Sequence, residues 1–521
     1  MPTTRSLLRE DITYSVARDK EVNILHQLKY PDQQAQFFSL LETHHHWIQA
    51  VVAHHLNLSV KACQVADSNE WLHGSYNVCI PVDLSTSNSP TRVLLRIPLP
   101  YRVGEHFRPG NADEKIRCEA GTYAWLEENC PDIPIPQLYG FAMSTGEAFT
   151  RTDYLPFLPS WLHRLGKLML RLLGCQLPSK YIRHQTRRDV SGVSRLNVSY
   201  MLLEYIEPTR GTMLSSTWSL KKDDARLRTN FLRDLSRIYL SLSKTPLPRI
   251  GSFTIDSRGC LLLNNRPLSL GIQELENEHI PTDMPRDYTY STVDSFVVDT
   301  LSYHDSRLRC QPNAINDLSD YIYQTSSLTT MRAIFPSFFD RALRRGPFIY
   351  SLTDLHQSNI FVDDDWHITS LVDLEWACSL PIEMLHPPHW LTSMAVDRID
   401  SHEYNQVRSE FMSALDAEEN GCSHASGNAS TVSPKLSSIM GTAWDRGTFW
   451  YSLALSSPTG LFTIFDKEIQ PRFTQRCSDH DAFHQTMPWY WQQDIVTASR
   501  RKLADKQAYD IQLQREFGVD D

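Results

Sequence analysis

The chain has 521 residues, of which 41% are hydrophobic and 10% aromatic, so it can bury a core and is not a disordered chain. Its 51 Lys and Arg against 61 Asp and Glu give a net charge of -10, which argues against a general nucleic-acid binder because such proteins carry a basic excess. No uninterrupted apolar stretch reaches the roughly 18 residues of a membrane span, so we expect no transmembrane helix.

The cysteine pattern and the first residues indicate the cellular compartment of the protein. The ten cysteines are scattered without a Cys-x-x-Cys pair, and the opening Met-Pro-Thr-Thr-Arg lacks the apolar run of a signal peptide. Both features favour a reducing, cytoplasmic location.

Residues 1–70 show helical periodicity and predict an N-terminal helical leader. Residues 71–206 predict a small lobe. Within it, Asn77–Val82 and Arg92–Ile97 are Val-, Ile- and Leu-rich runs separated by turn formers, which predicts a hairpin. Ala112–Asn129 predicts a helix with Asp113 as N-cap, and Met201–Ile206 a buried strand at the lobe boundary.

Residues 154–190 contain a basic insertion, because Tyr154–Arg188 holds seven Lys or Arg and no acid. Trp161–Leu173 places leucines along one side of a helix with basic residues between them, a pattern typical of a membrane-surface or partner-binding helix. Packing against the molecule itself is the alternative that we favour here, and peripheral membrane contact through 161–173 is the second.

Residues 207–415 predict a large, mainly helical lobe interrupted by two short strands, Ile360–Val362 and Leu371–Val372. The predicted helices of this region are Asn230–Leu242, Val293–His304, Ala314–Tyr323 and Thr329–Leu343. The polar, small residues 416–436 predict a flexible loop, and 437–521 a helical extension.

The strongest chemical signal lies at 348–376, where Asp354 is followed by Asn359 on one tight loop and by Asp373 after a returning strand. Phosphoryl transfer needs a base at the attacking hydroxyl and magnesium at the phosphates. Asp354 suits the base, and Asn359 and Asp373 suit the metal. In the alternative, Asp354 caps a turn and Asp373 forms a surface ion pair.

This passage resembles the aminoglycoside phosphotransferase and choline kinase group of kinase-like enzymes, particularly the fungal aminoglycoside-phosphotransferase-domain proteins. The family motifs Asp-Leu-His-x-x-Asn-Ile-x-Val-Asp and Ile-Asp-x-Glu are nearly reproduced by 354–363 and 372–375. The resemblance implies an α+β, two-lobed protein-kinase-like fold with a small antiparallel-sheet lobe and a large mainly helical lobe. It also implies ATP and Mg²⁺ as cofactors.

The same resemblance implies nucleotide contacts upstream. Gly74, Ser75 and Asn77 look like the family's phosphate-covering turn, or form an ordinary hairpin turn. Arg96 stands where the family presents a lysine to the phosphates, with Glu119 as its acidic partner; the alternative for Arg96 is a surface strand residue. The segment from Glu204 to Ile206 resembles the hinge strand that meets the adenine.

Two departures from the family pattern stand out, Arg96 for the lysine and Leu352-Thr353 for the His-Gly before the catalytic aspartate. We therefore expect a phosphotransferase acting on a hydroxyl of a small molecule. The alternative is a catalytically weak or inactive pseudokinase that serves as a nucleotide-binding or interaction scaffold. A protein kinase is disfavoured because Pro387-Pro388 follows Asp373 too soon for an activation segment.

Overall fold

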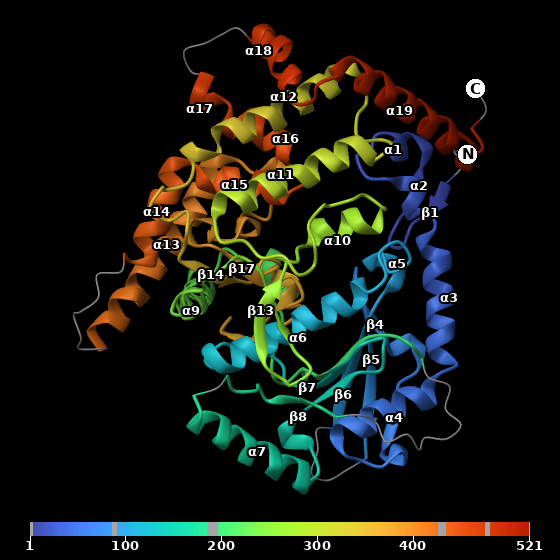
Figure 1. The fold of residues 1–521 in the computed structure, drawn as a ribbon, viewed down its shortest axis with the longest axis vertical. Coiled ribbons are helices and arrows are strands. Elements are labelled where there is room, and N and C mark those ends of the chain that lie inside the picture. Colours follow the sequence, from blue (N-terminus) through green and yellow to red (C-terminus); the bar gives the residue numbers. More distant parts are fainter. Residues whose placement is uncertain are drawn as a thin grey trace.

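The computed structural model describes residues 4–85, 91–174, 176–184, 196–425, 434–474 and 480–519. It combines helices with antiparallel sheets, the largest sheet at one end of the molecule and most helices at the other (Figure 1). None of the helices in these ranges is both long and apolar enough to cross a membrane.

The largest sheet has eight strands in the order β3-β5-β6-β10-β7-β8-β9, with β4 added beside β5, and each of its strand pairs is antiparallel. Its strands are β3 (Cys63–Val65), β4 (Leu72–His73), β5 (Asn77–Leu84), β6 (Arg92–Pro98), β7 (Leu138–Ala142), β8 (Ala148–Arg151), β9 (Tyr181–Arg183) and β10 (Tyr200–Glu204). The predicted hairpin is confirmed as β5 and β6, which pair from Asn77↔Pro98 to Asp83↔Arg92.

Helices cover both faces of this sheet because its strands are apolar on both sides. On β10, Tyr200 and Leu202 pack with α4 (His45–Leu56), whereas Met201 and Leu203 share a core with α6 (Asn111–Asn129). The alternation follows from the two-residue period of a strand. Arg96 lies on β6 one residue away from Leu95, which belongs to the α4 side, so it faces α6.

The predicted helix over 112–129 is confirmed as α6, but its N-cap is Gly110 and not Asp113. The Asp113 carboxylate instead accepts hydrogen bonds from the main-chain N–H of Ser144 at 2.7 Å and from its hydroxyl at 2.8 Å. Asp113 therefore fastens the helix to the loop after β7.

Apart from a two-stranded sheet near the N-terminus, three small sheets lie in the rest of the described residues. They are formed by β11 (Thr212–Met213) with β15 (Ile360–Val362) and β16 (Ile368–Leu371), by β12 (Ser252–Ile255) with β13 (Leu261–Asn265), and by β14 (Phe348–Ser351) with β17 (Cys378–Pro381). The two strands predicted around 360 and 371 are confirmed, whereas the β12–β13 hairpin lies in a region that the sequence predicts to be mainly helical.

Helices make up most of this remainder: α8 (Leu214–Lys221), α9 (Ala225–Ser243), α10 (Leu270–Asn277), α11 (Val293–Cys310) and α12 (Leu318–Ile334). The prediction of two helices over 314–323 and 329–343 is wrong, because one helix, α12, spans the gap between them. The hydroxyls of Thr325, Ser326 and Ser327 donate to carbonyls four residues back, which lets polar residues sit inside the helix.

The long helix α13 (Ser401–Ala425) corrects the loop prediction for 416–436, because residues 416–425 are helical and only 426–433 lie outside the described residues. After it come α14 (Leu436–Arg446), α15 (Thr448–Ser456), α16 (Leu461–Ile464), α17 (Pro471–Thr474), α18 (His480–Thr486) and α19 (Ile495–Phe517).

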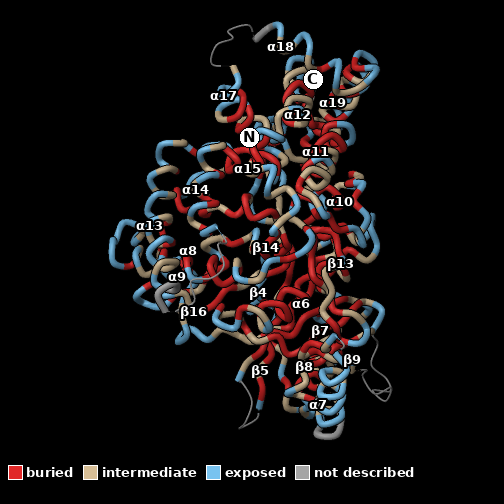
Figure 2. Tube along the Cα trace, turned by 60° about the vertical axis from the view of Figure 1, so that its left-hand side comes forward, coloured by how far each residue is buried: buried red, intermediate tan, exposed pale blue. Residues whose placement is uncertain are grey.

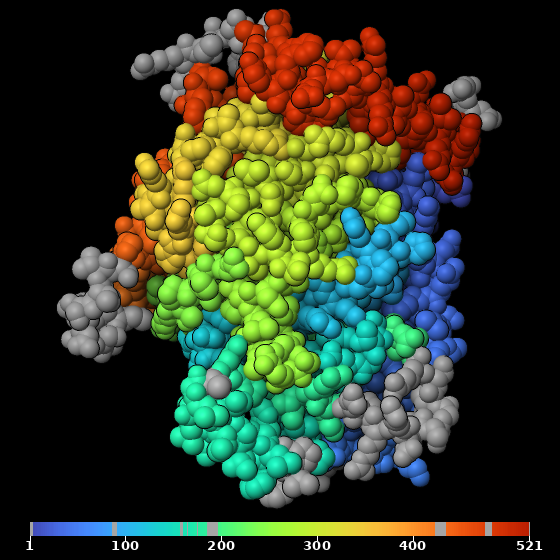
Figure 3. All heavy atoms as spheres, viewed as in Figure 1, coloured from blue at the N-terminus to red at the C-terminus, as the bar shows by residue number. Residues whose placement is uncertain are grey.

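The two ends of the chain meet. Helix α19 lies against the N-terminal residues, which contain β1 (Thr4–Ser6), β2 (Asp11–Thr13), α1 (Tyr14–Arg18) and α2 (Ile24–Gln27) (Figures 1 and 3). Its Tyr509, Leu513 and Phe517 form a buried cluster with Ile12 and Ile24. Helices α3 (Tyr30–Glu42) and α5 (Pro100–Val103) contact each other beside the large sheet.

Helix α7 (Phe157–Leu172) projects at the sheet end of the molecule and is largely exposed (Figures 1 and 2). The expectation that its apolar side packs against the molecule is wrong. Trp161, Leu162, Leu165 and Leu168 are 44–54% exposed, and Leu172 is 76% exposed.

Candidate functional site

Two loops carry the residues of the predicted site, and the strands around them hold the loops together. The first, 352–359, connects β14 to β15; the second, 372–377, connects β16 to β17. Since β14 pairs with β17 and β15 with β16, both ends of one loop are fixed beside both ends of the other. The N–H of Val372 donates to the carbonyl of Asn359 at 2.9 Å. Asp373 is therefore one residue beyond the position that pairs with Asn359.

Asp354 and Asn359 are in direct contact. The Asn359 amide nitrogen donates to the Asp354 carbonyl at 2.9 Å and to its carboxylate Oδ2 at 3.3 Å. Asn359 is buried, and among the described residues its amide oxygen accepts a hydrogen bond only from the Ser358 hydroxyl, at 3.4 Å. The structure therefore brings the amide and the carboxylate of this loop together as predicted.

Asp373 joins the site through Arg96. An Arg96 guanidinium nitrogen lies 2.7 Å from the Asp373 carboxylate, and Arg96 also reaches Glu119 at 2.6 Å and the Glu375 carboxylate. The predicted Arg96–Glu119 ion pair is present, and the alternative of Arg96 as a surface residue is wrong because only 3% of it is exposed. Asp373 has φ = 56°, a left-handed backbone that is uncommon outside glycine.

Sequence reasoning missed two members of this site, Lys115 and Glu375. The Lys115 ammonium donates to Glu375 and to the Asn77 amide oxygen, both at 2.6 Å, and Asn77 donates back to Glu375 at 2.7 Å. We call Asn77, Arg96, Lys115, Glu119, Asp373 and Glu375 the charge cluster. The motif itself offered a signal for Glu375, which occupies the last position of Ile-Asp-x-Glu.

The carboxyl groups of the site perturb one another's pKa values. Burial, and after it the nearby carboxylates of Glu375 and Asp373, raise the pKa of Asp354 to about 7. Burial also raises the pKa of Glu119, against the effect of Arg96. For Glu375 burial acts in the same direction, but Lys115 and Arg96 outweigh it and its pKa is lowered.

The remaining predicted residues lie apart from the charge cluster. Gly74 is in the turn between β4 and β5, with no atom within 4 Å of where a Cβ would stand. Ser75 contacts Arg9 through its hydroxyl at 3.2 Å and Arg102 through its carbonyl at 2.8 Å. Gly74 is linked to the charge cluster through the main chain, since its N–H donates to the carbonyl of Asn77 at 3.0 Å. Among the described residues, no side-chain hydrogen bond or ion pair joins Gly74 or Ser75 to the charge cluster.

The predicted hinge begins where β10 ends. The Glu204 carboxylate accepts from the main-chain N–H of Gln137 at 2.9 Å and from Arg210 at 2.7 Å, so it holds the backbone in place. In the part of the chain that the structure describes, no protein group bonds the main-chain N–H and C=O groups of Tyr205 and Ile206. These groups are free to meet a ligand.

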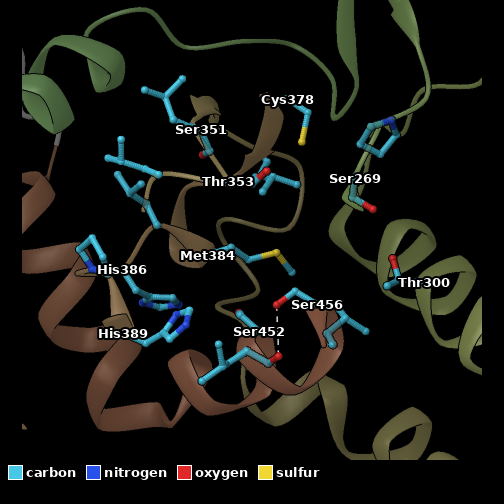
Figure 4. A pocket seen from close by; sticks show the side chains of 18 of the residues that line it. Ser269, Thr300, Ser351, Thr353, Cys378, Met384, His386, His389, Ser452 and Ser456 are labelled. Atoms are coloured by element: carbon cyan, nitrogen blue, oxygen red, sulfur yellow. Dashed lines mark hydrogen bonds between the residues drawn. The ribbon is translucent and has the colours of Figure 1, made fainter. Parts of the chain in front are cut away.

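A cavity of about 260 Å³ adjoins the first loop (Figure 4). Its wall includes both chain neighbours of Asp354, Thr353 and Leu355, and extends to α11, α15 and the segment after β17. Thr353, Cys378 and Met384 lie on one side of this space, and Thr300 and Ser456 on others (Figure 4). The described residues contain no group of three or more His, Cys, Asp or Glu side chains arranged to hold a metal ion.

Comparisons with known proteins add little. No family model and no curated protein matches the chain. A choline kinase from Cryptosporidium parvum Iowa II has a TM-score of 0.34 and 9% identity, covering 91% of this chain and 97% of that chain. A macrolide 2'-phosphotransferase type I has a TM-score of 0.28 and 10% identity, covering 78% and 90%. These TM-scores and identities assign the chain to no family.

Proposed function

We propose that this protein is an ATP- and magnesium-dependent phosphotransferase acting on a hydroxyl of a small molecule, with a two-lobed arrangement of the protein-kinase type. The observation that supports the proposal is the pairing of the two loops: Asn359 bonds Asp354 and accepts from the N–H of Val372, and the next residue, Asp373, pairs with the buried Arg96. A base, an amide and a carboxylate at one place are the groups that phosphoryl transfer needs.

Charge balance supports a bound cation. Four acidic side chains face two basic ones, the acids being Glu119, Asp354, Asp373 and Glu375 and the bases Arg96 and Lys115. If all are ionised, the site carries two surplus negative charges. A divalent cation supplies two positive charges and would relieve the mutual repulsion of these carboxylates.

The oxygen atoms present fit magnesium. The amide nitrogen of Asn359 donates to Asp354, which leaves its oxygen as an acceptor, and Arg96 occupies only one oxygen of the Asp373 carboxylate. Asn359 and Asp373 would therefore each offer one oxygen. Magnesium keeps several water or phosphate ligands and does not need a cage built wholly of protein, so two such oxygens suffice. When bound, it would neutralise the charge of the phosphates.

The chain's own groups have distinct tasks in this proposal. The Asp354 carboxylate accepts the proton of the acceptor hydroxyl, and Asn359 fixes that carboxylate by its hydrogen bond. Arg96, oriented by Glu119, holds the Asp373 carboxylate in place and adds positive charge beside the phosphates. The unpaired main chain of Tyr205 and Ile206 is available to an adenine, and the open turn at Gly74 to the phosphates.

The test separates binding from chemistry. Nucleotide binding is measured by calorimetry with and without Mg²⁺, and turnover by a coupled assay over a panel of alcohols. Asp354→Asn is expected to keep nucleotide affinity and to lower turnover by about 10² to 10⁴-fold. Asp373→Asn is expected to remove the magnesium dependence of binding.

Asp364→Asn, on the exposed turn between β15 and β16, is the matched control and should change neither readout. Turnover that survives Asp354→Asn rules out the base role.

Two observations favour a second candidate, a nucleotide-binding scaffold without activity. Arg96 already neutralises one oxygen of Asp373, and the loop begins with Leu352-Thr353. The scaffold predicts nucleotide binding that does not depend on Mg²⁺, together with no turnover on any alcohol.

A further inference from the structure

We infer that the acceptor is an uncharged, largely apolar alcohol, bound in the cavity beside Asp354. This inference rests on the proposed function for the meaning of "acceptor", but its evidence is the chemistry of the cavity wall. No Asp, Glu, Lys or Arg is among the described residues that line the cavity. The wall is formed mainly by apolar and aromatic side chains, among them Tyr239, Ile272, Phe296, Met384, Trp390 and Phe449.

The histidines of the wall are neutral. Burial lowers the pKa of His386 to about 3 and that of His389 to about 4, so neither carries charge at neutral pH. A cationic acceptor would lose its hydration here and find no carboxylate in return, which is costly. Aromatic faces could offset part of that cost, so the comparison must be made between a cation and its neutral isostere.

Two hydroxyls of the wall, those of Ser351 and Ser452, are buried without a hydrogen-bond partner among the described residues and could bond a hydroxyl of the acceptor. Other hydroxyls of the wall are engaged within the protein. Thr353 donates to the carbonyl of Trp376 at 2.7 Å, Thr300 to that of Phe296 at 2.8 Å, and Ser456 to that of Leu453 at 3.1 Å. The oxygens of these three hydroxyls can still accept a hydrogen bond, but their hydrogens are already donated to main-chain carbonyls. Such a wall suits an apolar body with few hydroxyl groups, and not a highly polar sugar-like molecule.

The experiment is a binding titration of the full chain with choline and with dimethylbutanol, its uncharged isostere, and then with naphthylmethanol as a larger neutral alcohol. We expect the neutral isostere to bind about tenfold or more tightly than choline, since each 1.4 kcal/mol is a factor of about ten. Thr300→Asp, which places a carboxylate in the wall, should reverse the order. Met384→Trp should fill the space and weaken all three without changing nucleotide affinity.

The readout needs no phosphoryl transfer, so the two proposals fail separately. Choline binding as tightly as its isostere, or no binding of either neutral alcohol, overturns the inference whatever the turnover. Normal selectivity in a protein whose turnover survives Asp354→Asn leaves the inference standing and overturns the role of Asp354.

A second inference comes independently from α7. We propose that this helix docks onto a lipid bilayer with anionic headgroups. Its orientation is the reverse of that of an ordinary surface helix: the apolar residues are exposed, whereas His163, Lys167 and Leu170 on the other side are only partly exposed. The side that carries His163 and Lys167 faces the molecule. The ammonium of Lys167 interacts electrostatically with the carboxyl group of Glu128, and His163 hydrogen-bonds the main chain of Ser179.

Shape and charge both favour a membrane surface as the occupant. The helix lies at one end of the molecule's longest axis (Figures 1 and 2). Arg171 is exposed beside the apolar face, and residues 154–188 contain no acid. Apolar side chains flanked by cations suit the boundary between acyl chains and anionic headgroups.

The test is sedimentation of the full chain with phosphatidylcholine vesicles that contain or lack phosphatidylserine. Binding is expected to require the anionic lipid, and the double variant Leu165→Glu with Leu168→Glu to weaken it about tenfold or more. Leu220→Glu on α8, 85% exposed in the parent, is the matched control and should bind as the parent does.

Binding that the double variant retains, or no binding to either vesicle, overturns the proposal. Concentration-dependent dimers that the double variant abolishes, without vesicle binding, also overturn it and assign the face to a second copy of the chain.

Discussion

Glu375 is the residue on which the charge cluster depends, because one of its carboxylate oxygens receives Arg96, Lys115 and Asn77 together. All four side chains are buried. A buried ion pair adds little net stability over an apolar pair, but removing one partner leaves the other charge buried and uncompensated.

We therefore expect Glu375→Gln to lower the free energy of unfolding by about 3 to 5 kcal/mol, because Arg96 and Lys115 lose their shared counter-charge. Urea unfolding measures this. Glu410→Gln is the control. It removes the carboxylate that pairs with Arg228, and because that carboxylate is 52% exposed, the loss should lower the free energy of unfolding by less than about 1 kcal/mol. Equal costs for the two variants would contradict the role of Glu375.

His304 gives a prediction about pH. Burial, together with the nearby Arg307 and Arg332, lowers its pKa to about 4, and its ring nitrogen bonds the carbonyl of Leu455 at 2.7 Å. A histidine with a lower pKa in the folded than in the unfolded protein stabilises the fold above about pH 6.5, and that stabilisation is lost as the pH falls toward 4.

Between pH 7 and pH 5 this histidine should lower the free energy of unfolding by about 2 kcal/mol, and His304→Gln should abolish that part of the decline. Urea unfolding at the two pH values measures it. Tyr303→Phe removes a 3.2 Å hydrogen bond to the same carbonyl and should change stability equally at both values. A decline that His304→Gln leaves intact would assign it to other groups.

The sequence predicted those site residues that are close together in one motif. Asp354 and Asn359 share a loop, and Asp373 follows after a short hairpin. Lys115 was missed because its partner is 260 residues away, and no local pattern reports such a contact. It does lie four residues before Glu119, on the same face of one helix, which was the available signal.

At the scale of elements, α6, the helix that carries Glu119, lies close to β12. Gly121 allows this approach, because a Cβ there would stand 2.2 Å from the carbonyl oxygen of Phe253. The backbone of β12 cannot retreat as the end of a flexible side chain could.

Gly121→Ala is expected to destabilise the protein by about 1 to 3 kcal/mol through this clash. The control is Gly441→Ala in α14, where no atom lies within 4 Å, and it should stabilise by about 0.4 to 1 kcal/mol because alanine has less freedom to lose on folding. Thermal melting gives both signs. A stabilising Gly121→Ala would contradict the close approach.

The elements that the sequence missed have physical explanations. The apolar runs at 253–255 and 260–263 flank the turn Asp-Ser-Arg-Gly and are each too short for periodicity to distinguish a strand from a helix. The split of α12 arose from its polar Gln-Thr-Ser-Ser at 324–327, which is buried and bonded within the helix. For α7 the amphipathic pattern was evident, but only the structure places its apolar side toward solvent.

At the scale of the whole molecule, α19 ties the two ends of the chain together. The main-chain N–H of Ile24 donates to the Tyr509 hydroxyl at 3.0 Å, and Leu513 is fully buried against the N-terminal residues. The stability of the first 28 residues should therefore depend on a helix that follows almost 500 residues later.

Leu513→Ala should lower the stability of this region by about 2 to 5 kcal/mol. Hydrogen exchange is the measurement, with faster exchange expected both in residues 11–27 and in α19. Ile511→Ala, at a position 41% exposed, should leave exchange at both ends unchanged. Faster exchange confined to α19 would show that the ends are independent.

The hairpin of β15 and β16 also governs where this chain can accept added residues. Its register sets Ile360 opposite Leu371, one position from Asn359 and two from Asp373. A residue inserted within either strand would turn every later side chain of that strand to the opposite face. An insertion in the exposed turn at 363–365, at the far end of the hairpin, would leave the side chains of both strands on their present faces. Natural length variation and engineered tags should therefore be tolerated at that turn and rejected in the strands.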